Sequence, residues 1–178
     1  MVLSDPPWKY THSRPFIQCP YPCMTTGEIA ALPVATTFLK TKIPTVLFMW
    51  TTDSHLEQAL TVIKKWKFKY KTIAFHWVKT RKNRPVKRQG YYSKKSSEIV
   101  LLATRGHVTK FIKEKPDQLV YAECGRHSEK PWVIHEAIEK MFPEAEKFEM
   151  FARKKKQGWK SWGNEIQNDF TLKEDGQQ

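Results

Sequence analysis

The chain has 178 residues, with 31 Lys plus Arg against 18 Asp plus Glu and a formal net charge of +13. This length is typical of one domain with a continuous buried core. Such an excess of positive charge predicts attraction to a polyanion, with strong salt dependence. The apolar runs at 46–50 and 99–103 are far too short to span a bilayer, which excludes a membrane-spanning interpretation.

The three cysteines, Cys19, Cys23 and Cys124, are too few and too unevenly spaced for a disulfide framework. With no secretory segment, they predict free thiols and a cytoplasmic, reducing compartment. Cys19 and Cys23 lack a second ligand pair at zinc-like spacing, so we expect no metal site.

Strand-like and helix-like segments alternate along the chain, which is typical of an α/β protein. Apolar runs of strand length and helical periodicity both recur, and prolines separate them. We therefore expect one domain over 1–170, with a mostly parallel sheet, helices on both faces and ligands at the carboxyl ends of the strands. The tail 171–178 is polar and expected to be disordered. The expected strands are 1–4, 45–50, 71–78, 97–104 and 147–151, and the expected helices are 25–32, one opened by a capping box at 54–57, and 131–142.

A short motif, Asp5-Pro6-Pro7-Trp8, follows the first expected strand. The two prolines donate no backbone N–H, so this loop offers carbonyl acceptors beside the Asp5 carboxylate. Acceptors suit a ligand that carries an NH2 group, and the Trp8 ring offers a flat face to a base. Adenine meets both requirements.

Together with three later segments, this motif resembles the MT-A70-like family of N6-adenine methyltransferases. The later segments are RHSEKP at 126–131, EMFAR at 149–153 and WKSWGNE at 159–165. The resemblance implies a Rossmann-like methyltransferase sheet in permuted order, with the DPPW motif first and the cofactor strand last. It also implies S-adenosyl-L-methionine as the cofactor. The implied catalytic residues are Asp5, Pro6, Pro7 and Trp8, and the implied cofactor-binding residues are Asp5, Ser128, Lys130, Phe151, Arg153, Asn164 and Glu165.

Some of these residues also have a purely structural interpretation. Ser128 fits a helix N-cap, and Lys130 fits either a surface charge or an anion site at a helix start. Trp159 and Trp162 are expected to pack beneath the turn that carries Asn164. Larger family members hold the cofactor adenine with a residue upstream of DPPW. We expect this chain to use the sheet edge near Phe151 instead.

Two loops are candidates for binding substrate. The first, 9–24, is rich in proline and resembles the family's gate beside the target base, where Tyr21 is either an adenine contact or a surface turn residue. The second, 79–95, contains eight Lys or Arg and no acidic residue. Interleaved tyrosines favour nucleic-acid contact over a solvated charged loop. The candidate substrate-binding residues are Trp8, Tyr21, Lys79, Arg81, Lys82, Arg84, Lys87, Arg88, Tyr91 and Tyr92.

The sequence therefore predicts a methyltransferase that modifies the N6 amine of adenine in nucleic acid, with DNA slightly favoured over RNA. Its expected partners are a single-stranded or flipped-base nucleic acid and a second copy or related methyltransferase-like subunit. Two alternatives stay open: a non-catalytic binding subunit of a methyltransferase complex, and a methyltransferase for cytosine N4.

Overall fold

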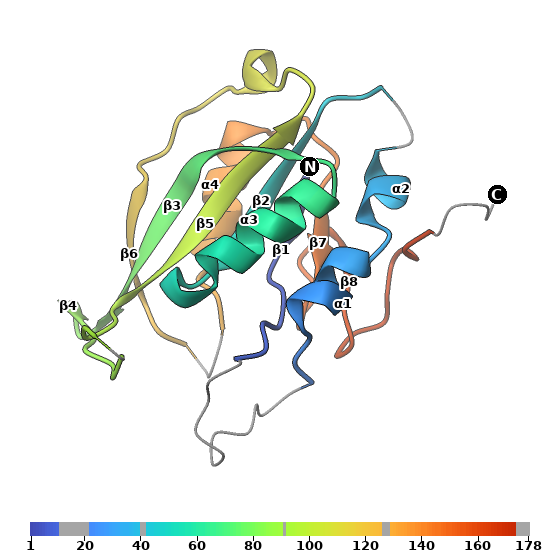
Figure 1. Cartoon of the computed structure of the whole chain (residues 1–178). Coiled ribbons are helices and arrows are strands. Elements are labelled where there is room, and N and C mark those ends of the chain that lie inside the picture. The colour runs from blue at the N-terminus through green and yellow to red at the C-terminus, as the bar shows by residue number, and fades with distance from the viewer. Residues whose placement is uncertain (11–21, 40–41, 91, 126–128, 174–178) are drawn as a thin grey trace.

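The computed structural model describes residues 1–10, 22–39, 42–90, 92–125 and 129–173. Within these ranges one sheet is flanked by helices (Figure 1). The helices are α1 (Thr26–Ala31), α2 (Val34–Phe38), α3 (Leu56–Lys65) and α4 (Trp132–Met141), with short 3-10 turns at Asp53–His55 and Thr109–Phe111. The strands are β1 (Val2–Ser4), β2 (Thr45–Thr51), β3 (Lys69–Arg81), β4 (Arg84–Pro85), β5 (Ser97–Arg105), β6 (Leu119–Glu123), β7 (Phe148–Met150) and β8 (Lys160–Trp162).

The strands lie in the order β4-β3-β5-β2-β1-β7-β8, with β6 paired to the free side of β3. Strands β2, β1, β7 and β8 are parallel to one another, whereas β5 runs antiparallel to both β2 and β3. The carboxyl ends of β1, β2, β3, β7 and β8 therefore meet the amino end of β5 at one edge of the sheet. Ligands of open α/β sheets bind at this edge.

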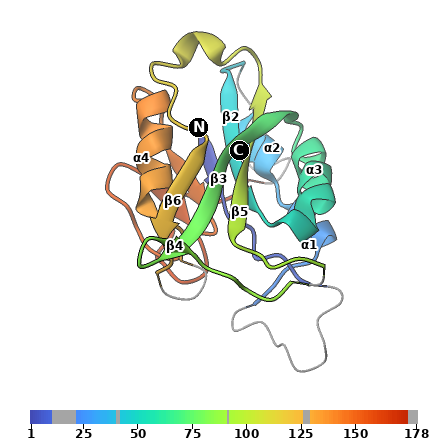
Figure 2. The same ribbon diagram turned by 90° about the vertical axis from the view of Figure 1, so that its left-hand side faces the viewer.

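Helices cover both faces of the sheet (Figure 2). On one face, α1, α2 and α3 bury a core that includes Ile29, Val62 and Trp66. On the other, α4 buries Ile134 and Ile138 against a second core. The strand β2 is buried along its whole length because its side chains alternate between the two cores.

The predicted fold class is confirmed, and so are most of the predicted elements. The capping box predicted at Ser54 is wrong: α3 begins at Leu56 after a 3-10 turn, and Ser54 Oγ instead contacts Thr52 Oγ1 at 3.2 Å. A capping box does open α1, where Thr25 and Glu28 bond reciprocally. The strands β4, β6 and β8 and the helix α2 were not predicted.

Cysteine pairing also differs from the prediction. Cys23 is disulfide-bonded, so the expectation of three free thiols is wrong at this residue, whereas Cys124 is free. Cys19 lies outside the described residues. In the described part of the chain, no helix combines the length and apolar character that crossing a bilayer requires.

Candidate active site

A cavity of about 390 Å³ opens at the carboxyl edge of the sheet. The segment after β1 supplies its floor, because Asp5, Pro6, Pro7 and Trp8 all line it. Its other walls come from the ends of β2, β5, β7 and β8, from the segments that precede α1 and α4, and from the residue Tyr10 just after the DPPW loop. They include Tyr10, Met24, Glu98, Lys130, Phe151, Arg153, Trp162, Asn164 and Glu165. The structure thus brings together segments from the first and the last parts of the chain.

The DPPW loop is held by backbone hydrogen bonds. The Trp8 N–H donates to the Pro6 carbonyl at 2.9 Å, and the Met24 N–H donates to the Pro7 carbonyl at 2.8 Å. A carbonyl oxygen has two lone pairs, so the Pro6 carbonyl keeps one acceptor position beside the Asp5 carboxylate. These bonds fix the acceptors before any ligand arrives.

Trp8 is more buried than expected of a ring that stacks on a base. Only 8% of Trp8 is exposed, and its Nε1 donates to the Trp50 carbonyl at 3.3 Å. Its ring is stacked on His55, with centroids 5.8 Å apart and planes 21° apart. Trp8 still lines the cavity, but much of its surface is used inside the protein.

Four charged side chains form a network beneath the cavity. The Lys130 ammonium donates to Asp5 Oδ2 at 2.8 Å and lies 3.4 Å from Glu98 Oε2. The second oxygen of Glu98 pairs with Lys79. Each of the two cations also lies over an indole ring, Lys130 over Trp50 and Lys79 over Trp77. Asp5, the predicted amine acceptor, and Lys130, the predicted cofactor contact, are therefore direct partners.

Burial and pairing oppose each other in this network. Burial raises the pKa of the Asp5 carboxyl above its ordinary value, and the Lys130 ammonium only partly offsets this effect. Burial opposes the charge on Lys130, but Asp5 and Glu98 outweigh it and raise the pKa of Lys130. For Glu98, burial is likewise outweighed by Lys130 and Lys79, and its pKa is lowered.

One wall of the cavity depends on the close approach of the Gly163 and Ala152 backbones. A Cβ on Gly163 would lie 2.1 Å from the Ala152 carbonyl oxygen, so only glycine fits there. The Ala152 N–H donates to the Trp162 carbonyl at 3.0 Å, which joins the ends of β7 and β8. Phe151 has a φ of 63°, a strained value of the kind found at functional sites.

Four of the predicted cofactor residues, Phe151, Arg153, Asn164 and Glu165, line this side of the cavity. Arg153 Nε donates to Glu165 Oε1 at 2.8 Å, and exposed Asn164 lies beside this pair on the cavity lining. Trp162 packs edge-on against Phe151 and also lines the cavity. Trp159 is buried and donates to Glu139, which confirms a packing role for that residue.

A second cavity of about 220 Å³ adjoins the first and shares Asp5, Lys130 and Phe151 with it. His135 and Glu149 line the second cavity. Three of their polar atoms are buried without hydrogen-bond partners in the described residues: both ring nitrogens of His135 and Oε2 of Glu149. His135 Nε2 is 3.2 Å from Glu149 Oε1, too poorly aligned for a hydrogen bond. Buried unsatisfied atoms are rare in folded proteins and mark places where a polar ligand group can bind.

The predicted substrate residues divide into two groups. Lys79 is only 18% exposed and belongs to the charge network. The second group consists of exposed cations that have no ion pair in the described residues. They lie on or just after the turn between β3 and β4: Arg81, Lys82, Arg84, Lys87 and Arg88. Lys82 and Asn83 both have positive φ, as a two-residue hairpin turn requires. We call residues 81–95 the basic hairpin.

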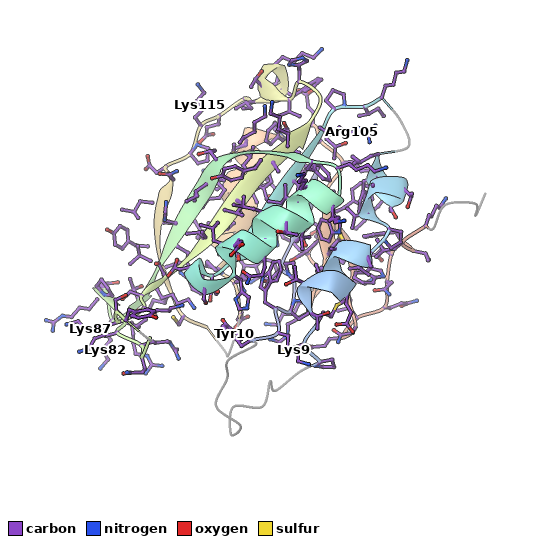
Figure 3. The ribbon with its side chains drawn as sticks, in the orientation of Figure 1. Lys9, Tyr10, Lys82, Lys87, Arg105 and Lys115 are labelled. Atoms are coloured by element: carbon purple, nitrogen blue, oxygen red, sulfur yellow. The ribbon has the colours of Figure 1, made fainter. Side chains whose placement is uncertain are left out.

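The basic hairpin projects at the same end of the molecule as the cavity. Lys82 and Lys87 lie at the end that carries Lys9 and Tyr10, opposite Arg105 and Lys115 (Figure 3). Tyr92 is fully exposed. Tyr21, Tyr91 and Ser128, which the sequence also proposed, lie outside the described residues.

Sequence reasoning missed Glu98, Tyr10, His55 and Glu149. Glu98 begins a strand whose antiparallel direction was not predicted, and this direction alone brings it to the cavity. Tyr10 is two residues beyond the DPPW motif and could have been found as the aromatic residue nearest to it in sequence. His55 carried no local signal for a site, whereas Glu149 stands in the EMFAR segment but was not proposed as a site residue.

The chain is similar to several known methyltransferases. It is 31% identical to the type II methyltransferase M.MunI of Mycoplasma sp, over 93% of this chain and 77% of that protein. It is 28% identical to the N(6)-adenosine-methyltransferase MT-A70-like of Arabidopsis thaliana and 25% identical to the N(6)-adenosine-methyltransferase catalytic subunit METTL3 of Homo sapiens. Those alignments cover 93% and 98% of this chain but only 23% and 29% of the two relatives. The MT-A70 family profile matches residues 1–165, and the chain therefore belongs to the MT-A70 family, whose members are N6-adenine methyltransferases.

Proposed function

We propose that this protein transfers a methyl group from S-adenosylmethionine to the N6 amine of adenine in nucleic acid. We favour DNA over RNA as its substrate. The observation that carries the proposal is the placement of the Asp5 carboxylate beside the Pro6 carbonyl, on a cavity at the carboxyl edge of the sheet. Two fixed acceptors match the two hydrogens of an NH2 group.

The proposed role of these acceptors follows from the chemistry of the amine. The lone pair of the adenine N6 is delocalised into the ring, so the amine is a poor nucleophile. Hydrogen bonds from its two hydrogens to Asp5 and Pro6 favour a more tetrahedral nitrogen with an available lone pair. The rate then comes mainly from positioning, because the proton leaves after transfer and no strong base is required.

The residues that line the two adjoining cavities fit the proposed cofactor. S-adenosylmethionine, when bound, would supply a methyl group on a positively charged sulfur. Lys130 suits its carboxylate, and the unpartnered Glu149 Oε2 suits its ammonium group. Asn164 and Glu165 supply the donors and acceptors that ribose hydroxyls need.

We assign the basic hairpin to the nucleic-acid backbone. Its cations have no acidic partners in the described residues, so they are free to contact phosphates. A base inside a duplex must leave the stack before its amine can reach Asp5, which favours single-stranded or distorted substrates.

The test is to incubate matched DNA and RNA oligonucleotides with the protein and S-adenosylmethionine, digest them to nucleosides and measure methylated products by mass spectrometry. We expect N6-methyladenine nucleoside, most of it from DNA, and none with Asp5→Ala. N4-methylcytosine would support the cytosine alternative. No product together with retained nucleic-acid binding would support a non-catalytic subunit.

A further inference from the structure

Among the described residues that line the cavity, Tyr10 has the most exposed aromatic side chain. It lines the cavity and is 46% exposed, whereas Trp8 is 8% exposed. Stacking on a base requires an accessible ring face, because the interaction scales with the overlap of two flat surfaces. Of these two rings, Tyr10 therefore has the larger surface available to a base.

Tyr10, His55 and Trp8 form a row of three contacting rings, which we call the three-ring stack. The Tyr10 and His55 centroids are 4.4 Å apart with planes at 76°, and His55 also stacks nearly parallel to Trp8. His55 meets the Tyr10 ring nearly at right angles, and 46% of Tyr10 stays exposed. The Trp8 end of the stack is anchored through its bond to the Trp50 carbonyl in β2.

His55 is itself fixed in place. It is 6% exposed, its Nδ1 is 3.0 Å from Thr52 Oγ1, and the backbone of Lys9 also hydrogen-bonds to it. Burial lowers the pKa of His55, so the ring is neutral at pH 7 and suited to packing between two aromatic rings. The stack is thus rigid before substrate binds, which reduces the entropy lost on binding.

Tyr10 also lies at the end of the molecule that carries both proposed substrate contacts. It shares a cavity with Asp5 and Pro6, and it lies at the same end of the molecule as the basic hairpin (Figure 3). A base that enters this cavity from a strand on the hairpin therefore has Tyr10 within the same cavity as Asp5.

We infer that Tyr10 is the ring on which the target base stacks, and that His55 is the positioning residue that holds it. This inference rests on the proposed function, and it adds a substrate contact that the sequence had placed on Trp8 and Tyr21.

The inference can be tested by the fluorescence of a single-stranded oligonucleotide that carries one 2-aminopurine flanked by thymines. The protein concentration is chosen so that the oligonucleotide is saturated, which is checked by the fluorescence anisotropy of a label at its end. Wild-type protein should quench the 2-aminopurine by stacking, Tyr10→Phe should keep the quenching, and Tyr10→Ala should lose it. With a substrate that has one adenine, Tyr10→Ala should raise KM about 10- to 100-fold, in line with the removal of one base–aromatic stack. Its cofactor affinity should equal that of wild type.

A matched control is Tyr70→Ala, because Tyr70 is a 39%-exposed tyrosine at the start of β3, the end of that strand away from the basic hairpin. It should leave quenching and KM unchanged. His55→Ala should weaken quenching, and His55→Phe, which keeps a ring in the stack, should restore most of it. The restoration separates positioning from a general loss of folding.

Wild-type quenching and KM in Tyr10→Ala would overturn the inference, and so would a wild-type protein that gives no quenching at saturation. Failure of the proposed function gives a different result. In that case wild-type protein quenches the probe and Tyr10→Ala does not, but no N6-methyladenine forms on the adenine substrate.

Discussion

Lys130 and Arg88 both contribute positive charge at the end of the molecule where the β3 strand finishes, but their surroundings are opposite. The Lys130 side chain is 15% exposed and is paired with two carboxylates and an indole ring. Arg88 is exposed and has no acidic partner in the described residues. A paired, buried charge is fixed in position and little affected by salt, whereas an unpaired surface charge acts over a distance and is screened.

The difference separates two tasks at one end of the fold. The charge network around Lys130 sets the position and ionisation of the groups that would meet the reacting amine and cofactor. The basic hairpin attracts a polyanion without fixing its sequence, because phosphate contacts position the strand but carry no sequence information. Variants in the two regions should therefore change different measured quantities.

The largest effect is expected for Asp5→Ala. Loss of the carboxylate removes one of two acceptors for the amine, and methyl transfer should fall about 10³-fold or more. Folding should be retained, because Lys130 keeps Glu98 as a partner at 3.4 Å. Single-turnover assays and thermal unfolding check these outcomes. Wild-type turnover in this variant would remove Asp5 from the mechanism.

The next largest effect is expected for Glu98→Gln, because Glu98 pairs with both buried lysines, Lys79 and Lys130. The variant leaves Lys79 without its carboxylate and Lys130 with only one, which should lower the free energy of unfolding by about 3 kcal/mol at pH 7. The pKa of Glu98 is lowered in the folded protein, so its contribution is complete above its ordinary value of 4.5 and is lost as the pH falls below it.

The pH dependence of this variant supplies its own control. Denaturant titrations of wild type and Glu98→Gln should differ most at neutral pH and begin to converge only as the pH falls below 4.5, toward the lowered pKa of Glu98 in the folded protein. A difference that is constant over this range would show that Glu98 acts through packing and not through its charge.

Several features of this comparison could be foreseen from the sequence, and others could not. Asp5 and Lys130 each stand in a local motif whose chemistry can be argued from adjacent residues. Their pairing across 125 residues depends on how β1 and the start of α4 meet, which no local pattern encodes. Ser54 shows the reverse case: its local pattern predicts a helix cap, but its hydroxyl bonds to Thr52 and Lys95 and the helix begins later.

The next effect in size concerns the basic hairpin. Replacing Arg81, Lys82, Arg84, Lys87 and Arg88 with Ser should raise KM for every oligonucleotide about 10- to 100-fold at low salt. The salt slope of binding should shrink by about 0.7–0.9 for each phosphate that the variant no longer neutralises. Cofactor affinity should not change, which calorimetry can check.

The control for the hairpin variant removes the same number of charges from the opposite end of the molecule. Lys64, Lys65, Arg105, Lys110 and Lys115 are all exposed there, and Arg105 and Lys115 are marked in Figure 3. Their replacement should leave KM and the salt slope nearly unchanged. If the two variants behave alike, the hairpin is a solvated surface, and the nucleic-acid site is then expected at Lys154, Lys155 and Lys156.

The smallest effect is expected for Lys79→Ser, which tests the boundary between the two regions. In sequence Lys79 begins the basic segment, but in space it pairs with Glu98 and lies 4.9 Å from the centroid of the Trp77 ring. It should therefore behave as part of the charge network: the salt slope should stay at its wild-type value, because Lys79 neutralises no phosphate. Turnover should fall only a few-fold, since Glu98 still has Lys130 as a partner. Oligonucleotide binding measured at four or five salt concentrations decides the matter, because a reduced slope would place Lys79 with the hairpin cations after all.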